Sequence, residues 1–383
     1  MSSINTAAQR NLGTIFQNAQ PLVEHVPHTA SGIRISGTDR GVRISGADRG
    51  VRISSQSGVR ISGARRGVRI SSADRGVRIS GEDRGVRISG EDRGVRISSR
   101  GVRISGGDRG VRISGTERGV RISGEDRGVR ISSHEGVRIS SRAGVRISGE
   151  ERGVRISGQE RGVRISSRTG VRISGTERGV RISGHDRGVR ISGEDRGVRI
   201  SSQAGVRISG QERGVRISGE DRGVRISSRC GVRISSRAGV RISGENRGVR
   251  ISSQRRGVRI SSRAGVRISG QQGVRISSTD RGVRISSRAG VRISGQDRGV
   301  RISGRHGVRI SSTDRGVRIS SQAGVRISAA ERGVRISAAD RGVRISSQAG
   351  VRISSADRGV RISGQDRGVR ISGRSSRQLT AAA

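Results

Sequence analysis

Length, composition and charge limit the classes of protein to which this chain can belong. It has 383 residues and a net charge of +47, and every basic residue other than His is Arg. There is no Trp or Tyr and only one Phe, whereas a globular core normally takes much of its buried area from aromatic side chains. An ordinary globular domain is therefore the class that fits the sequence least well.

Membrane insertion and conventional secretion also lack their sequence signals. No stretch approaches the roughly 18 apolar residues of a membrane span, and no charged segment followed by an apolar run marks a conventional signal peptide. The single Cys230 has no second cysteine to pair with and occupies a position where sister repeats carry Ala or Thr. We expect no transmembrane segment and no disulfide framework.

The first part of the chain, residues 1–31, is not repetitive and has the pattern of a short amphipathic helix. Its apolar positions at helical spacing are Leu12, Ile15, Phe16 and Ala19. Asn5 or Thr6 is a suitable N-cap, and Pro21 ends the pattern. Stacked repeats need a cap over their open end, so we expect this helix to cover the start of the repeat fold.

The same leader carries a second signal in its polar residues. It begins with SSINTAAQ, which is rich in Ser, Asn and Gln, includes the aliphatic Ile4, and has no acidic residue before Glu24. In these features the leader resembles the export leaders of type III secreted bacterial effectors. The resemblance implies a secreted effector or accessory protein that acts on host material, and it implies nothing about what the repeats bind.

Residues 32–373 are a repeat of one pentad, and residues 374–383 form a short polar tail. The repeat has 40 units, one GIRIS at Gly32–Ser36 and 39 GVRIS. Successive units are nine residues apart in 25 intervals, eight in 13, and seven in one, between Gly94 and Gly101. Because the pentad stays fixed while the spacers vary, we interpret the pentad as the constrained element. The alternative is a translated DNA repeat without function.

The pentad has the alternation of a β-strand. Val86 and Ile88 lie two residues apart with Arg87 between them, so a strand puts both aliphatic side chains on one face and Arg on the other. A helix would separate Val and Ile by about 200°. The spacers have turn composition. We expect an all-β repeat protein, a β-solenoid with about two units per coil; the alternatives are an antiparallel meander and a largely disordered repeat.

The pentad arginines are the candidate binding residues. Most nine-residue units carry an acid next to a spacer Arg, so the spacers are near neutral and the 40 pentad Arg supply most of the charge. At about 4.8 Å per coil the repeat would carry roughly one charge per 2 Å, close to the one per about 1.7 Å of duplex DNA. The representative candidates are Arg78, Arg87, Arg96, Arg103, Arg112, Arg121 and Arg130.

Such a surface predicts polyanions as partners, because Arg binds phosphate and carboxylate groups in a bidentate manner. We expect non-specific binding of nucleic acid or acidic polysaccharide, with an anionic membrane surface and end-to-end self-association as further partner hypotheses. The lack of aromatic residues argues against base stacking on single strands. The competing interpretations are a secreted effector, a structural or adhesive scaffold, and a solvated face that keeps a stacking fibre soluble.

Catalytic and metal-binding patterns are weak. The five His residues, His25, His28, His134, His185 and His306, are scattered over unrelated positions. A nine-residue repeat with one acid is similar to the calcium-binding nonapeptide β-roll, but here Arg follows the acid and a third of the units lack it. We expect no enzyme, no cofactor and no metal site.

Overall fold

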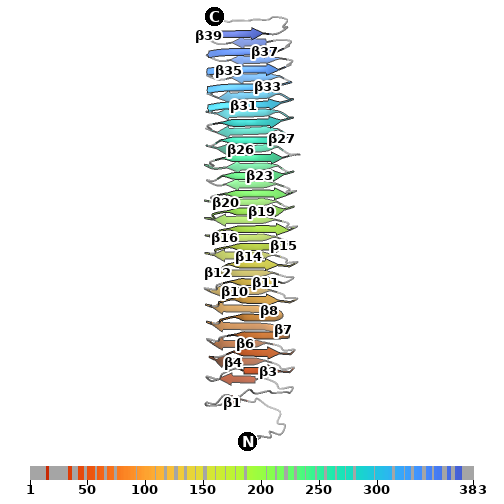
Figure 1. The fold of residues 1–383 in the computed structure, drawn as a ribbon, viewed down its shortest axis with the longest axis vertical. Helices are drawn as coiled ribbons and strands as arrows, with labels where there is room; N and C mark the ends of the chain where they lie inside the picture. Colours follow the sequence, from red (N-terminus) through yellow and green to blue (C-terminus); the bar gives the residue numbers. More distant parts are fainter. Residues whose placement is uncertain are drawn as a thin grey trace. The chain divides into compact units, whose positions relative to one another are not determined.

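The pentads form β-strands in the computed structural model, most of them short, and two strands contain two pentads each (Figure 1). The structure describes residues 14–16 and most of residues 33–372, apart from short stretches between the strands. The chain divides into two compact units, unit 1 (Met1–Arg178) and unit 2 (Gly179–Ala383), and each is an all-β parallel solenoid. Among the described residues we find no helix, and hence none long and apolar enough to cross a membrane.

The strands of unit 1 are mostly four or five residues long and begin at the pentad Val. They are β1 (Thr14–Phe16), β2 (Ile33–Ser36), β3 (Val42–Ser45), β4 (Val51–Ser55), β5 (Val59–Ser62), β6 (Val68–Ser72), β7 (Val77–Gly90), β8 (Val95–Gly106), β9 (Val111–Ser114), β10 (Val120–Gly124), β11 (Val129–Ser132), β12 (Val137–Ser141), β13 (Val145–Ser148), β14 (Val154–Gly158), β15 (Val163–Ser167) and β16 (Val171–Gly175).

Most strands of unit 2 follow the same pattern. The strands of this unit are β17 (Val180–Gly184), β18 (Val189–Gly193), β19 (Val198–Ser202), β20 (Val206–Gly210), β21 (Val215–Gly219), β22 (Val224–Ser227), β23 (Val232–Ser236), β24 (Val240–Ser243), β25 (Val249–Ser253), β26 (Val258–Ser262), β27 (Val266–Gly270), β28 (Val274–Ser278), β29 (Val283–Ser287), β30 (Val291–Gly295), β31 (Arg298–Gly304), β32 (Val308–Ser312), β33 (Arg315–Ser321), β34 (Val325–Ser328), β35 (Arg332–Ala338), β36 (Val343–Ser346), β37 (Ala349–Ser355), β38 (Val360–Ser363) and β39 (Arg367–Ser372). Of these, β31, β33, β35, β37 and β39 begin two residues before the pentad Val and are six or seven residues long.

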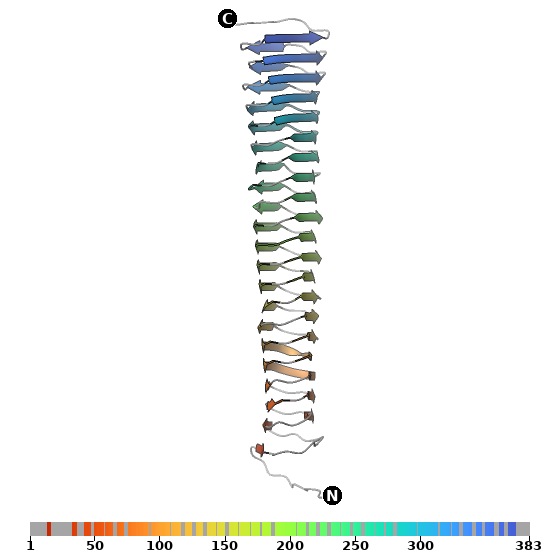
Figure 2. The same cartoon turned by 60° about the vertical axis from the view of Figure 1, so that its left-hand side comes forward.

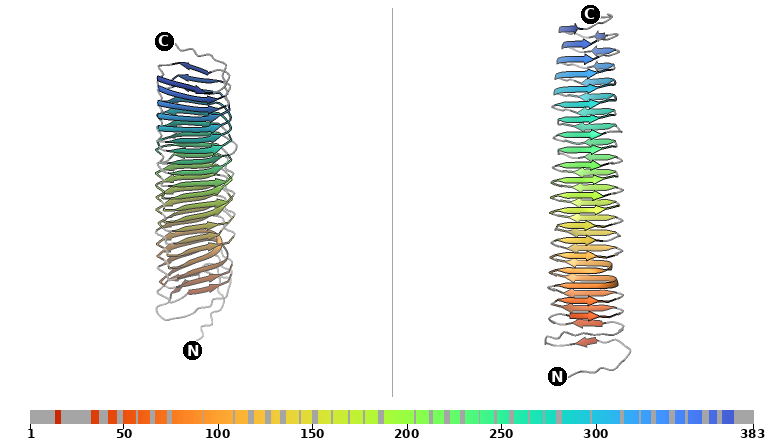
Figure 3. Two further views of the ribbon diagram at one scale, coloured as in Figure 1. Left: turned by 45° about the horizontal axis from the view of Figure 1, so that its top comes forward. Right: turned by 45° about the vertical axis from the view of Figure 1, so that its right-hand side comes forward.

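Strand pairing joins every second strand, in parallel and with identical residues opposite each other. In unit 1, β10 pairs with β12 through Val120↔Val137 and Ile122↔Ile139, and β11 pairs with β13 in the same register. Consecutive strands therefore alternate between two ladders and run in opposite directions (Figures 1 and 3). The prediction of a β-solenoid is confirmed, and the antiparallel meander is wrong, because neighbouring strands within a ladder are parallel.

Each unit has two ladders of paired strands. In unit 2, the even ladder contains β18 through β38 and the odd ladder contains β17 through β39. In unit 1, the first ladder contains β2, β4, β6, β10, β12, β14 and β16, and the second contains β3, β5, β9, β11, β13 and β15. The long strands β7 and β8 contribute to both. Figure 2 shows the two ladders of each unit side by side.

The core of each unit consists of the pentad Val and Ile side chains. Nearly all of them are at most 3% exposed, and in strand after strand the burial alternates as the sequence predicts, with Val and Ile buried and Arg exposed. Because like residues pair, Val stacks on Val and Ile on Ile along a ladder. The Val N–H continues the ladder hydrogen bonds, as when Val120 donates to the Gly136 carbonyl at 3.0 Å. Burying each such side chain contributes about 1.5–3 kcal/mol.

The seven-residue interval is absorbed between pentads without disturbing them. Strand β7 pairs with β8 through Val77↔Val95 and again through Val86↔Val102, and the register shifts between Ser80 and Arg84. The two missing residues are therefore taken out of the spacer, which has no core side chain to realign. Variation in unit length is compatible with the fold because only the pentads form the core.

The predicted N-terminal helix is wrong where the structure describes it. Thr14–Phe16 form strand β1, which pairs in parallel with β2 through Ile15↔Ile35. The edge of β2 offers ladder N–H and C=O groups that a strand satisfies and a helix does not, and Thr, Ile and Phe all favour strands. Leu12 and Ala19, with the rest of the predicted helix and the 374–383 tail, lie outside the described residues. The domain division at residues 31 and 373 stays a prediction.

The residue after the pentad is Ala in two units (Ala329 and Ala338) and Gly or Ser in the others, and Gly and Ser behave differently. Gly106 (φ +154°) and Gly124 (φ +144°) are the last residues of β8 and β10 and pair in register, and a Cβ on Gly124 would collide with the Gly106 carbonyl oxygen. Where Ser takes the position, as at Ser167 and Ser202, its side chain is buried and continues the strand alternation. The corner thus has a glycine form and a buried-serine form.

Candidate functional site

The seven predicted arginines are all exposed, and the pairing distributes them over both ladders of unit 1. Arg87, Arg103 and Arg121 are paired along the first ladder. The other four, Arg78, Arg96, Arg112 and Arg130, are paired along the second ladder. The alternation of the pentad brings about this outward placement, because Val and Ile on either side of each Arg are buried. Their role in binding polyanions stays a prediction.

The division into two ladders changes the expected charge density. Neighbouring pentad Arg within one ladder are one strand apart, about 4.8 Å, so each ladder presents roughly one guanidinium per 4.8 Å. The estimate from the sequence summed all charges onto one face. Neighbouring charges still lie well within the Debye length of about 8 Å, so the arginines of one row repel one another. A bound polyanion relieves this repulsion.

Acidic spacer residues interact with spacer arginines. The Arg263 Nη1 lies 3.1 Å from the Glu245 Oε1, and both side chains are exposed. An exposed pair of this kind contributes at most about 1 kcal/mol to stability. Among the side chains that the structure describes, no carboxylate forms an ion pair with a pentad Arg.

A row of serine hydroxyls runs beside each Arg row, because the pentad Ser is two residues after Arg on the same side of the strand. The hydroxyl oxygens of neighbouring strands are within hydrogen-bond distance, at 2.8 Å for Ser140 and Ser157 and at 3.0 Å for Ser286 and Ser303. The outer side of a ladder thus combines charged guanidinium donors with neutral hydroxyl groups. Sequence reasoning identified the Arg row but not this second polar row.

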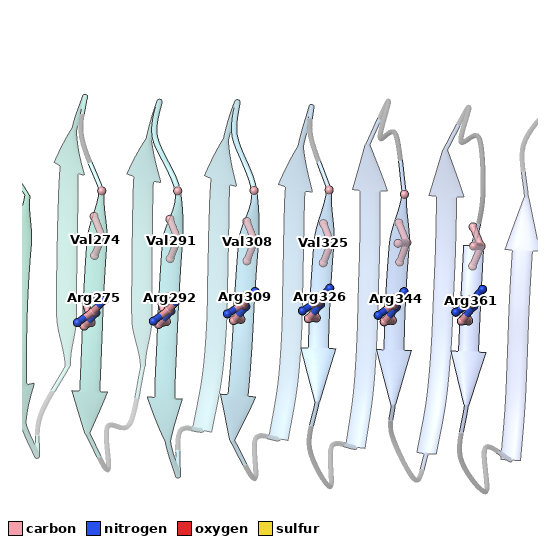
Figure 4. Close-up of a pocket in the computed structure, with 17 residues that line it drawn as sticks. Val274, Arg275, Val291, Arg292, Val308, Arg309, Val325, Arg326, Arg344 and Arg361 are labelled. Carbon is pink, nitrogen blue, oxygen red and sulfur yellow. The ribbon is translucent and has the colours of Figure 1, made fainter.

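In unit 2 the even ladder also carries a groove of about 850 Å³. It is lined by the pentad Val and Arg of β28, β30, β32, β34, β36 and β38, and by the Gly that precedes each of the first five of these strands. Figure 4 shows the Val and Arg rows along this ladder. The Val side chains are buried in the core or, at Val360, partly so, and the Gly residues have no side chain. The floor is therefore largely main chain, and the bordering arginines are Arg275, Arg292, Arg309, Arg326, Arg344 and Arg361.

Neither a metal site nor a catalytic group emerges from the described residues. Within that part of the chain no three His, Cys, Asp or Glu side chains gather as metal ligands would. His306 is described and exposed in a spacer. The other four histidines, and Cys230, lie outside the described residues.

Fold and surface together define the class: a parallel β-solenoid with two outward ladders of arginine and serine. No protein-family model, curated protein or solved structure matches the chain.

Proposed function

We propose that the protein is a non-enzymatic repeat scaffold whose arginine ladders bind polyanions without sequence specificity. The observation that carries the proposal is the in-register stacking of exposed pentad arginines, such as Arg87↔Arg103. A row of identical cations at a constant spacing attracts a polymer with repeated anions, and it has no varied side chains with which to read a base sequence. The proposal takes each coil as two pentad units, in keeping with the pairing of every second strand.

Binding is expected to weaken steeply with salt. A ligand that neutralises several arginines releases counterions, so log K should fall linearly with log salt, by about 0.9 for each phosphate contact on duplex DNA. Changing Arg87, Arg103 and Arg121 together to Gln should reduce the magnitude of this slope by about 2–3. Titrating labelled duplex DNA at several salt concentrations measures the slope.

The matched control removes three charges outside the pentads. Arg142, Arg168 and Arg237 are exposed spacer residues that already have interaction partners. Changing these three to Gln should lower the slope by less than the ladder variant does. Wild-type binding that persists undiminished at high salt would rule out the electrostatic mechanism.

A second proposal concerns the setting in which the scaffold acts. The leader residues SSINTAAQ resemble type III export leaders, which supports a secreted effector or an adhesive scaffold that uses the same surface. Fusing residues 1–31 to a reporter and measuring export by a type III system tests this. A leader that fails to direct export removes this proposal and leaves the polyanion proposal unchanged.

A further inference from the structure

The groove of the even ladder is long and narrow enough to hold one extended polymer chain. It spans six strands, and at about 4.8 Å per strand it is roughly 24 Å long. A volume of about 850 Å³ over this length gives a cross-section on the order of 35 Å². A duplex, whose major groove alone is about 12 Å wide, is too broad to enter it.

Short spacers distinguish this part of the even ladder. Four successive strands, β28, β30, β32 and β34, follow eight-residue intervals, and their pentads begin at Gly273, Gly290, Gly307 and Gly324. Neither ladder of either unit has even two such intervals in succession elsewhere. The four short spacers contain no acidic residue. The spacers of the nine-residue units between them are four residues long, and each contains Asp followed by Arg. The spacers that enter four of the six groove strands thus carry no carboxylate, whereas those that enter β36 and β38 contain Asp340 and Asp357.

Four of the five glycines that line the groove are not required by backbone conformation, and Gly342 (φ +146°) is the exception. Gly273, Gly290, Gly307 and Gly324 do not have the positive φ that favours glycine elsewhere in the chain. A Cβ on Gly290 or Gly307 would lie 3.4 Å from the next glycine carbonyl oxygen, which is an ordinary contact. A larger residue would be accommodated, and its side chain would fill the groove. Glycine at these positions keeps the floor open.

The lining chemistry favours an acidic polysaccharide over a single nucleic acid strand. The chain has one aromatic residue, Phe16, so the groove has no platform on which bases could stack. A sugar residue in an extended glycan advances by a length close to the spacing between neighbouring strands of the ladder. A glycan with one carboxylate or sulfate on each sugar would therefore meet one Arg per strand, and the paired N–H donors of Arg can bind two oxygens of either group.

We propose that the groove bordered by Arg275, Arg292, Arg309, Arg326, Arg344 and Arg361 is the binding site for one extended acidic polysaccharide chain, which lies lengthwise across the even ladder. The inference rests on the proposed polyanion binding and adds its location and ligand class. The neighbouring serine row offers hydroxyl groups to the sugar. The odd ladder has its own row of pentad arginines, and none of them lines this groove.

The test compares two variants of the full chain that lose the same charge. One changes Arg292, Arg309 and Arg326 to Gln in the groove, and its match changes Arg284, Arg301 and Arg318 to Gln on the odd ladder. Labelled heparin oligosaccharide and polygalacturonate are the probes, with labelled poly(dT) and duplex DNA for comparison. The groove variant should lose about tenfold or more in affinity for both glycans, and the odd-ladder variant about threefold or less.

A second pair of variants leaves the charge unchanged and blocks the groove. Gly290, Gly307 and Gly324 are changed to Gln, and the match makes the same change at Gly144, Gly231 and Gly265, which also lack positive φ. Only the groove-blocked variant should lose glycan affinity. Circular dichroism checks that each variant keeps its β structure.

The possible outcomes distinguish a failure of the proposed polyanion binding from a failure of the groove assignment. If wild type binds no polyanion, the proposed function fails. If wild type binds glycans but both arginine variants weaken equally, polyanion binding stands and the groove assignment is overturned. If blocking the groove displaces poly(dT) and leaves glycan binding unchanged, the polysaccharide class is overturned in favour of a single nucleic acid strand.

Discussion

Changing Ile285, Ile302 and Ile319 together to Ser is expected to melt unit 2 locally around β29, β31 and β33. These side chains are at most 1% exposed and stack on one another in the odd ladder. Truncating a buried Ile costs about 2–5 kcal/mol, and each buried hydroxyl without a partner adds to that cost. Because a solenoid repeat contacts only its neighbours, the loss should stay local. Hydrogen exchange and limited proteolysis should show lost protection near these strands.

The control for the core variant lies one residue further along each strand. Ser286, Ser303 and Ser320 are exposed, and changing them to Ala should shift stability by no more than about 0.5 kcal/mol each. Unit 1 should keep its protection in both variants. Protease resistance that is unchanged around β31 in the Ile variant would contradict the assignment of these side chains to the core.

Changing Gly106 and Gly124 to Ala is expected to destabilise unit 1 around β8 and β10. Both glycines have a φ that other residues rarely adopt, which costs on the order of 1–3 kcal/mol per residue. Each added Cβ would also collide with a main-chain carbonyl of the preceding strand, which cannot move without breaking the ladder. The combined loss should be about 3 kcal/mol or more. Hydrogen exchange at the β8 and β10 amides measures it.

The matched control changes glycines without positive φ. Gly290 and Gly307 to Ala should leave stability unchanged or raise it by about 0.4–1 kcal/mol, because alanine restricts the unfolded chain. Equal destabilisation by the two pairs would show that glycine is needed at every corner, and the distinction between the two kinds of glycine would be lost.

The core and fold class were predictable because the pentad carries a single, strong signal. Val and Ile two residues apart, as at Val86 and Ile88, fit one buried face of a strand, and no helix accommodates that spacing. Forty repetitions leave little choice but stacking, since one such strand cannot cover its own apolar face. The same reasoning failed at Thr14–Phe16, where apolar spacing alone suggested a helix and the open edge of β2 favoured a strand.

The candidate site was only partly predictable. Outward arginines followed from alternation, but their division between two ladders depends on which strands pair, and a pentad looks the same in either ladder. The groove depends on residues even further apart in the sequence. It spans six strands of one ladder, and the pairing register places the four pentads that begin at Gly273, Gly290, Gly307 and Gly324 side by side there.

Pairing of every second strand gives each solenoid unit a parity. Deleting or inserting pentads two at a time returns each later strand to its former ladder. An odd number moves all later strands of that unit to the opposite ladder. Removing one pentad between β18 and β28 would keep the groove strands together and join them to the other row of arginines upstream. Length variants of such a protein should therefore conserve their surface when they differ by even numbers of pentads.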